Sequence, residues 1–251
     1  MTPRLRLVLL ALALACIAPA LPAVIGALPV FGSHPLPYGD IINRLAPAER
    51  HVTNMVSAVN FDYRGFDTLG EEMMLFVAVT GTAVLLRGTR GEAITALPAT
   101  VPGRQIPPHS EALVLTARWF APVTILFGIY VVLHATVTPG GGFQGGVIIA
   151  SGLLLLYLGE GYAGWRRFMR NGPLDAIEGG GAAAYALAGF GPMLVGAQYL
   201  QNVLPLGSMK LLLSGGLMVV VNASVAFAVA GGFGILFVEF LEETRAEDPT
   251  Q

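Results

Sequence analysis

The chain contains 251 residues, of which 54% are hydrophobic and only 12% are charged. An average soluble domain has about 25% charged residues, so this composition is too apolar for a soluble fold. Residues 119–159 and 211–238 contain no Lys, Arg, Asp or Glu, and each run exceeds the roughly 20 apolar residues that a membrane-spanning helix needs. The sequence therefore predicts an all-α, polytopic integral membrane protein.

Several classes of function are excluded by the same composition. A net charge of -2 leaves no basic surface for nucleic acid. Cys16 is the single cysteine, so the chain has no intramolecular disulfide and no multi-cysteine metal site. The four histidines are scattered without the HxxxH or HExxH spacing of metal sites. We therefore expect no catalytic residue, no metal site and no cofactor.

Residues 7–31 form the first apolar run, which follows Arg4 and Arg6. A short basic start is typical of a signal peptide, but the run is longer than such a peptide needs and further spans follow. We favour a retained first helix over a cleaved signal. Pro19 and Pro22 are predicted to kink or shorten it.

Residues 32–67 are polar and proline-rich, and we expect an extracytoplasmic loop there. The second span is predicted at residues 69–86, where Thr68 and Glu71 fit a capping box. Glu71 and Glu72 would then lie in the first turn, where the helix dipole favours carboxylates. A second polar loop covers residues 87–110, and Ser110 is predicted to cap the next helix.

Four further spans are predicted at residues 111–137, 147–162, 180–200 and 209–237, which makes about six in all. We expect a two-helix segment over residues 1–110, a four-helix domain over residues 111–240 and an acidic cytoplasmic tail over residues 241–251.

Six spans place both termini on one side of the membrane. Ten basic residues then lie on the side of the termini, and four on the opposite side. Because cytoplasmic loops carry an excess of Lys and Arg, both termini are predicted to be cytoplasmic, in the cell (inner) membrane. The four basic residues on the outer side are Arg44, Arg50, Arg64 and Lys210.

His134 lies about one turn from the end of the third span. Imidazole changes its charge near neutral pH, so His134 is a candidate for a proton relay or an ion path. The alternative is an interfacial histidine that holds the following loop by hydrogen bonding.

That loop is the most unusual local feature of the chain. Its glycines permit positive φ and very close backbone approach, but it lacks the lysine and the preceding strand of a phosphate loop. It is either a re-entrant element of an ion path or a tight turn that docks against a neighbouring subunit, and we favour docking. Its residues are Thr138, Pro139, Gly140, Gly141, Gly142, Phe143, Gln144, Gly145 and Gly146.

The other polar residues of the spans have structural explanations. Glu160 is expected to pair with Arg166 or Arg167, and Gln198 and Asn222 to form interhelical hydrogen bonds. Small residues at four-residue spacing predict a face of close helix packing in the last span. That face comprises Ser214, Asn222, Ala226, Ala230 and Gly234.

Two segments resemble a known family. Residues 134–146 resemble the signature of the B subunit (MrpB or MnhB) of multisubunit Mrp-type sodium/proton antiporters, and the resemblance extends over residues 111–240. Residues 59–87 resemble the two-helix element at the C-terminal end of the A-type antiporter subunit, which also occurs as a small subunit of membrane-bound hydrogenases. The matching positions of this second motif are Asp62, Arg64, Asp67, Thr68, Gly70 and Glu71.

The resemblance implies a non-enzymatic subunit of a monovalent cation/proton antiporter, with A-, C-, D-, E-, F- and G-type subunits as partners. The chain has no lysine inside a span, which argues against pumping alone. We expect an ion path near the outer face, with Asp67, Glu71, Glu72 and His134 as candidate residues.

Two other functions remain open. One is a membrane subunit of a hydrogenase-like or complex I-like energy-coupling complex. A stand-alone secondary transporter is less favoured, because the sequence shows no inverted repeat and no ionisable group near the middle of a span.

Overall fold

The computed structural model describes residues 3–28, 31, 37–94 and 110–243, and these residues contain helices but no β-strand. Five helices in these ranges are long and apolar enough to cross a membrane. The expectation of an all-α, polytopic membrane protein is therefore confirmed. Most of the polar segment expected at residues 87–110 and of the acidic tail lies outside the described ranges.

Residues 1–41 form one compact unit, and residues 42–251 form another. The first unit contains α1 (Pro3–Ile17) and α2 (Ala20–Gly26). Pro19 stands at the break between these helices, because its ring removes a backbone donor and clashes with the preceding turn. The expected kink of the first apolar run is therefore confirmed at this position.

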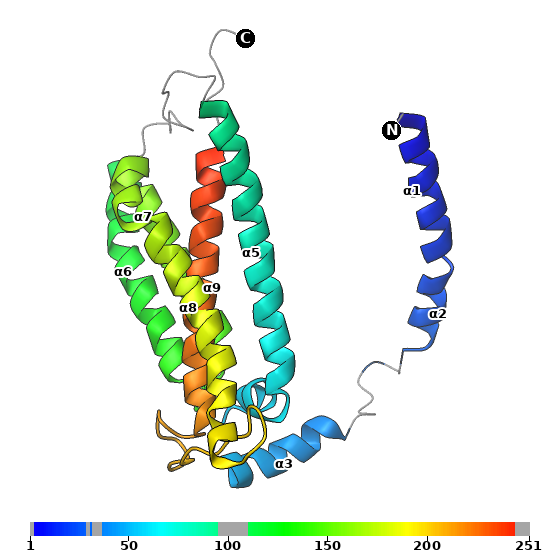
Figure 1. Ribbon diagram of the computed structural model, residues 1–251, viewed down its shortest axis with the longest axis vertical. Helices are drawn as coiled ribbons and strands as arrows, with labels where there is room; N and C mark the ends of the chain where they lie inside the picture. Colours follow the sequence, from blue (N-terminus) through cyan, green and yellow to red (C-terminus); the bar gives the residue numbers. More distant parts are fainter. Residues whose placement is uncertain (1–2, 29–30, 32–36, 95–109, 244–251) are drawn as a thin grey trace. The chain divides into compact units, whose positions relative to one another are not determined.

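The second unit begins within α3 (Tyr38–Arg50) and is a bundle of long helices with short helical segments at one end (Figure 1). The polar stretch after α3 is not a loop but contains a helical turn and a π-helical turn. The helical turn is α4 (Met55–Ala58) and the π-helical turn is η1 (Val59–Tyr63). The long helices follow as α5 (Gly65–Ile94), α6 (Glu111–Leu133), α7 (Gly142–Phe168), α8 (Asn171–Phe190) and α9 (Leu217–Glu243), with the short 3-10 helix η2 (Pro192–Val195) between α8 and α9.

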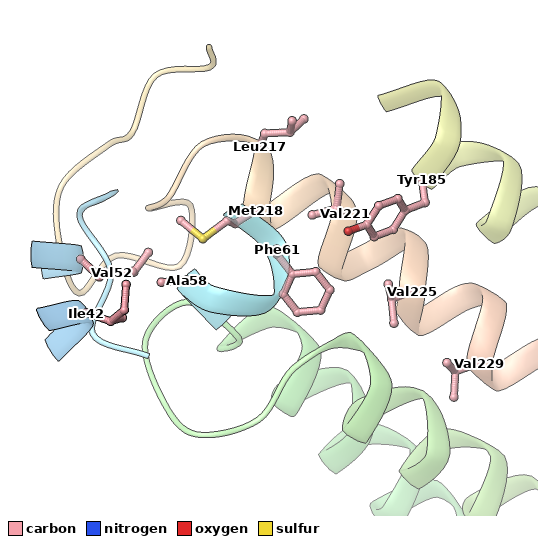
Figure 2. Close-up of a cluster of buried hydrophobic side chains, with 11 residues drawn as sticks. Ile42, Val52, Ala58, Phe61, Tyr185, Leu217, Met218, Val221, Val225 and Val229 are labelled. Carbon is pink, nitrogen blue, oxygen red and sulfur yellow. The ribbon is translucent and has the colours of Figure 1, made fainter. Parts of the chain in front are cut away.

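Helix α9 is the centre of this bundle and packs against α5, α6, α7 and α8. Its small residues lie on buried faces, and Asn222, Ala226, Ala230 and Gly234 are all buried. The predicted packing face is therefore confirmed for these four residues, whereas Ser214 lies before the helix begins. Apolar side chains from α3, η1, α8 and α9 form a core at one end of the bundle (Figure 2).

The second span begins earlier than its sequence pattern indicates. Helix α5 starts at Gly65, so Thr68 lies inside the helix and does not cap it. The Thr68 hydroxyl instead donates to the Asn60 carbonyl at 2.6 Å, so the predicted capping box is wrong. The cap of the next helix is confirmed, because Ser110 Oγ accepts from the Leu113 amide at 3.2 Å.

The last three helices also differ in extent from their predicted ranges. Helix α7 begins at Gly142, so half of the glycine-rich stretch is helical. Helix α8 ends at Phe190, ten residues before the predicted end, and α9 begins at Leu217 after a series of turns. Apolar turns with backbone held by tertiary contacts are indistinguishable from helix in a hydropathy pattern, which explains these errors.

Two predicted polar contacts are corrected. Glu160 pairs with Arg118 of α6 at 2.7 Å, whereas Arg166 pairs with Glu242 of α9 at 2.7 Å. Gln198 lies after α8 in the connection to α9 and is exposed, so it is not inside a span.

Candidate functional site

A pocket of about 490 Å³ lies at the end of the bundle where α5 and α7 begin. Both sequence motifs contribute to its wall: Thr68 and Glu71 come from the motif in α5, and Gly140, Phe143 and Gln144 come from the glycine-rich motif. The remaining wall is formed by Val56, Ser57, Asn60, Phe61, Val147 and Ile148. Two segments that are about 70 residues apart in sequence therefore form one site, which we call the motif pocket.

The glycine-rich loop is held in place by the segment that precedes η1. The Asn54 amide nitrogen lies 2.7 Å, 2.8 Å and 3.0 Å from the carbonyl oxygens of Ala135, Thr138 and Gly140. Its side-chain oxygen accepts from the Val56 and Ser57 amides and caps α4. Asn54 is buried, so it satisfies backbone groups that water cannot reach. The loop is thus a turn fixed by its own chain.

Helix α7 starts in direct contact with α9. The Gly142 amide donates to Asn222 Oδ1 at 2.9 Å, which confirms the predicted interhelical hydrogen bond of Asn222. A Cβ atom on Gly142 would lie 2.1 Å from the Asn222 carbonyl oxygen. Gly142 is therefore required by close backbone approach.

Asp62 of the second motif has a structural role outside the pocket. It accepts from Arg50 Nε and from Asn202 Nδ2, each at 2.7 Å. Asn202 Oδ1 in turn accepts from the Leu217 amide at 2.9 Å. Asp62 therefore connects α3 to the start of α9.

Tyr63, next to Asp62, donates its hydroxyl to Glu49 Oε2 at 2.8 Å. Partial burial and the charge of Glu49 raise the pKa of Tyr63 to about 12. Its phenol therefore remains a neutral donor at physiological pH.

Three of the predicted motif residues lie on the exposed surface near the start of α5. Arg64 and Asp67 form an ion pair, with Arg64 Nε 2.6 Å from Asp67 Oδ2. Both side chains are more than half exposed, and neither lines the motif pocket. Gly70 is also on this surface, and nothing lies within 4 Å of the position that its Cβ would take. Asp67 is thus a neutralised surface acid in this structure.

Glu71 and Glu72 are adjacent in sequence but have opposite environments. Glu71 is exposed and lies in the wall of the motif pocket. Glu72 is 1% exposed, and among the described residues neither of its carboxylate oxygens has a hydrogen-bond partner. Successive residues on a helix point about 100° apart, so one acid faces the pocket while the other enters the bundle.

His134 is the residue that ends α6, and it is not part of the pocket wall. Its Nδ1 lies 2.9 Å from the Tyr130 carbonyl oxygen, and its ring packs against the Tyr130 ring at a tilt of 31°, with centroids 3.8 Å apart. Its own carbonyl accepts from the Val137 and Thr138 amides, each at 2.9 Å. The backbone of His134 therefore helps to shape the first turn of the glycine-rich loop.

Four buried or paired charged residues carry no sequence signal that marks them as members of a site. Glu178 of α8 is 4% exposed, and Glu239 of α9 is fully buried. Arg87 of α5 donates from Nε to Glu239 Oε1 at 2.7 Å and pairs with Asp175 at 3.0 Å. Pro173 next to Gly172 is a typical helix start, and this signal would have placed Glu178 inside a helix. In the described ranges no three His, Cys, Asp or Glu side chains gather as a metal site.

Known proteins match this chain in both sequence and fold. Residues 112–235 match a domain related to the MnhB subunit of Na+/H+ antiporters. A chain of the membrane-bound sulfane sulfur reductase, an archaeal respiratory membrane complex, is 27% identical with a TM-score of 0.72. That match covers 95% of this chain and 99% of the other.

Curated relatives include an uncharacterised protein of Methanocaldococcus jannaschii, which is 29% identical and matches 72% of this chain and 74% of its own length. A probable K+/H+ antiporter A/B-type subunit of Rhizobium meliloti is 30% identical over 60% of this chain. This chain spans only 16% of that relative.

A structure of the Mrp complex from Dietzia sp. has the same fold, with a TM-score of 0.72 and 22% identity. That match covers 99% of this chain and 27% of the Dietzia chain.

The fold and these matches define a multi-pass membrane protein. Residues 112–235 belong to the family of domains related to the MnhB subunit of Na+/H+ antiporters.

Proposed function

We propose that this chain contributes the motif pocket to a multisubunit antiporter that exchanges a monovalent cation for protons, and that the pocket is a vestibule for these ions. The observation that carries the proposal is the meeting of both family motifs at one pocket with an acid in its wall. The chain would move ions with its partner subunits and perform no covalent chemistry. The cation is Na+ in the family description and K+ in the name of the Rhizobium relative.

The lining of the pocket suits a small cation. Glu71 supplies a negative charge, and the side chains of Ser57, Asn60, Thr68 and Gln144 supply neutral oxygen atoms. A cleft with one sign of charge raises the local concentration of the opposite ion. Oxygen ligands also match the preference of hard cations.

The other candidate residues have supporting positions in this proposal. Glu72 lies directly behind Glu71 and would receive protons from the vestibule. Asp67 would add to the field at its rim, moderated by Arg64, and His134 would maintain the loop that carries Gly140. Each of these roles is part of the proposal.

We also propose that the motif pocket faces outward and that both termini are cytoplasmic, in the cell (inner) membrane. Arg50, Arg64 and Lys210 lie toward the pocket end, whereas the other end of the bundle carries more arginines: Arg87, Arg118, Arg166, Arg167 and Arg170. The excess of basic residues on cytoplasmic sides supports this orientation. The division into segments 1–110, 111–240 and 241–251 belongs to the same proposal.

Membrane vesicles that contain the assembled complex test the vestibule. Replacing Glu71 by Gln removes the charge of the pocket and keeps the shape of the side chain, so the KM for the cation should rise about tenfold. Glu111→Gln at the exposed start of α6 is the matched control and should leave exchange unchanged. Normal cation dependence in an assembled Glu71→Gln complex would contradict the vestibule.

The match to a chain of the respiratory complex favours a second function, because that match covers 99% of the other chain. In that case the chain would belong to a complex in which electron transfer drives ion movement. Purification in mild detergent distinguishes the two functions. Co-purifying redox subunits would support the respiratory complex, and antiporter subunits without a redox module would support the antiporter.

A further inference from the structure

Glu72 and Glu178 are buried acids inside the helix bundle, beyond the motif pocket. Their exposed fractions are 1% and 4%. In the part of the chain that the structure describes, both oxygens of Glu72 and Oε1 of Glu178 are buried without a hydrogen-bond partner. An ionised carboxylate without a partner is strongly disfavoured in an apolar interior. Each acid therefore needs a proton or a bound cation.

The packing of α5 on α8 places both acids at the interface of these helices, with the Glu178 carboxylate near Val79 and therefore closer to the Arg87 end than Glu72. The Tyr185 hydroxyl of α8 donates to the Gly65 carbonyl of α5 at 2.9 Å. Glu72 follows Gly65 by about two turns, and Glu178 precedes Tyr185 by about two turns, which keeps both acids on the contacting faces. The helices run in opposite directions (Figure 1), so both two-turn steps lead away from the pocket end.

Helix α9 leaves space for the Glu178 carboxylate. A Cβ atom on Gly232 would lie 3.1 Å from Glu178 Oε1 and 3.3 Å from Val79 Cγ2 of α5. Gly231 approaches the Glu178 backbone more closely still, because its Cβ would lie 2.6 Å from the Glu178 nitrogen. The carboxylate is thus at the junction of α5, α8 and α9.

Polar and charged groups lie on both sides of Glu72 and Glu178, toward the motif pocket and toward the other end of the bundle. Toward the pocket lie Glu71 and the Tyr185 hydroxyl, which is already committed to the Gly65 carbonyl. Toward the other end Arg87 pairs with Asp175 and Glu239. The nearby cation is therefore engaged by other acids and does not permanently neutralise Glu72 or Glu178.

We propose that Glu72 and Glu178 form an interior proton-relay pair, which passes protons between the motif pocket and the Arg87 end of the bundle. A proton that enters past Glu71 binds Glu72. Glu72 then releases it through water to Glu178, so the total charge of the pair is unchanged by the transfer. Glu178 releases the proton toward Asp175 and the far end. The direction of entry rests on the proposed function, whereas the pair itself does not.

Carbodiimide labelling of the native complex tests the pair without a variant. Dicyclohexylcarbodiimide modifies protonated carboxyl groups in apolar surroundings, and mass spectrometry locates the adducts. Adducts are expected on Glu72 and Glu178 and not on exposed Glu111, and they should decrease as the pH rises. Absence of adducts from both buried acids would overturn the proposal. Their loss on addition of Na+ alone would replace the proton relay with a cation site.

Variants of the assembled complex test whether the pair moves protons. Glu72→Gln and Glu178→Gln should each lower cation-driven proton transport about 100-fold, the scale of a positioned proton-transfer group. Glu72→Asp and Glu178→Asp should restore part of the rate, and Glu111→Gln should have no effect. Full transport in either assembled Gln variant would overturn the relay.

Two outcomes separate this relay from the vestibule. If Glu71→Gln leaves exchange intact while the Glu72 and Glu178 variants abolish it, the vestibule is wrong and the relay stands. If a Gln variant does not assemble, as judged by co-purifying subunits, the labelling of the native complex decides.

Discussion

At the end of the bundle where α5 and α9 end, three acids form ion pairs with arginines. Arg87 binds Asp175 and Glu239, and Arg166 binds Glu242. At the pocket end, Glu71 faces a cavity, and within the described bundle Glu72 has no partner. Acids paired with arginines hold helices together, whereas buried acids without a partner are the ones for which we propose exchange of protons. The contrast separates the structural end of the molecule from the end where we propose the vestibule.

The largest effect is expected at the structural end. Arg87→Ala would leave Glu239 buried without its guanidinium, and breaking such a buried pair costs about 3–5 kcal/mol of the free energy of unfolding. The exposed Arg64–Asp67 pair provides the control, because Arg64→Ala should cost less than about 1 kcal/mol. Thermal unfolding in detergent would measure both. Equal losses for the two variants would remove the distinction between the ends.

Close backbone packing at the pocket end predicts a second, slightly smaller effect. Gly142→Ala places a methyl group where a Cβ would lie 2.1 Å from the Asn222 carbonyl oxygen. Overpacking of this kind costs about 1–3 kcal/mol, so the variant should unfold at a lower temperature. Gly70→Ala is the matched control, because its site is open and Ala favours helix. A Gly142→Ala protein as stable as the Gly70→Ala protein would show that α7 and α9 can separate without cost.

The smallest effect concerns Tyr63, which belongs to the structural framework of the pocket end. Its pKa is raised from 10.0 to about 12 in the folded protein, so its contribution to stability is complete below pH 10 and lost as the pH rises through about 12. Tyr63→Phe should therefore be slightly less stable than the native chain at neutral pH. The difference in unfolding temperature should shrink in strongly alkaline buffer. A difference independent of pH would show that the Glu49 hydrogen bond is not its source.

Sequence reasoning found the helical membrane class, the cap at Ser110, the break at Pro19 and the interhelical role of Asn222. It placed the helix ends less well, because hydrophobicity continues through the turns before Leu217 and through the glycine-rich loop. The sequence does not predict the structural role of Asn54, for a different reason. A single asparagine in a polar stretch has no pattern, and its importance depends on three carbonyl groups about 80 residues away.

The candidate acids illustrate the same limit. The sequence pattern groups Glu71 and Glu72 with Asp67 and His134, because all four lie near one end of predicted spans. The structure separates them: Glu71 enters the pocket wall, Glu72 enters the bundle, Asp67 pairs with Arg64, and His134 ends α6. Glu178 is not among the candidate residues that the sequence indicates, because the predicted fifth span begins two residues after it.

The sequence by itself determined that this chain is an integral membrane protein, since long uncharged runs have no other stable environment. Its motifs pointed to the antiporter family. Tertiary structure alone decided which acids are compensated. That outcome depends on whether α5, α8 and α9 bring an arginine, a glycine or another glutamate to a given carboxylate, and the order of residues along one helix does not contain this information.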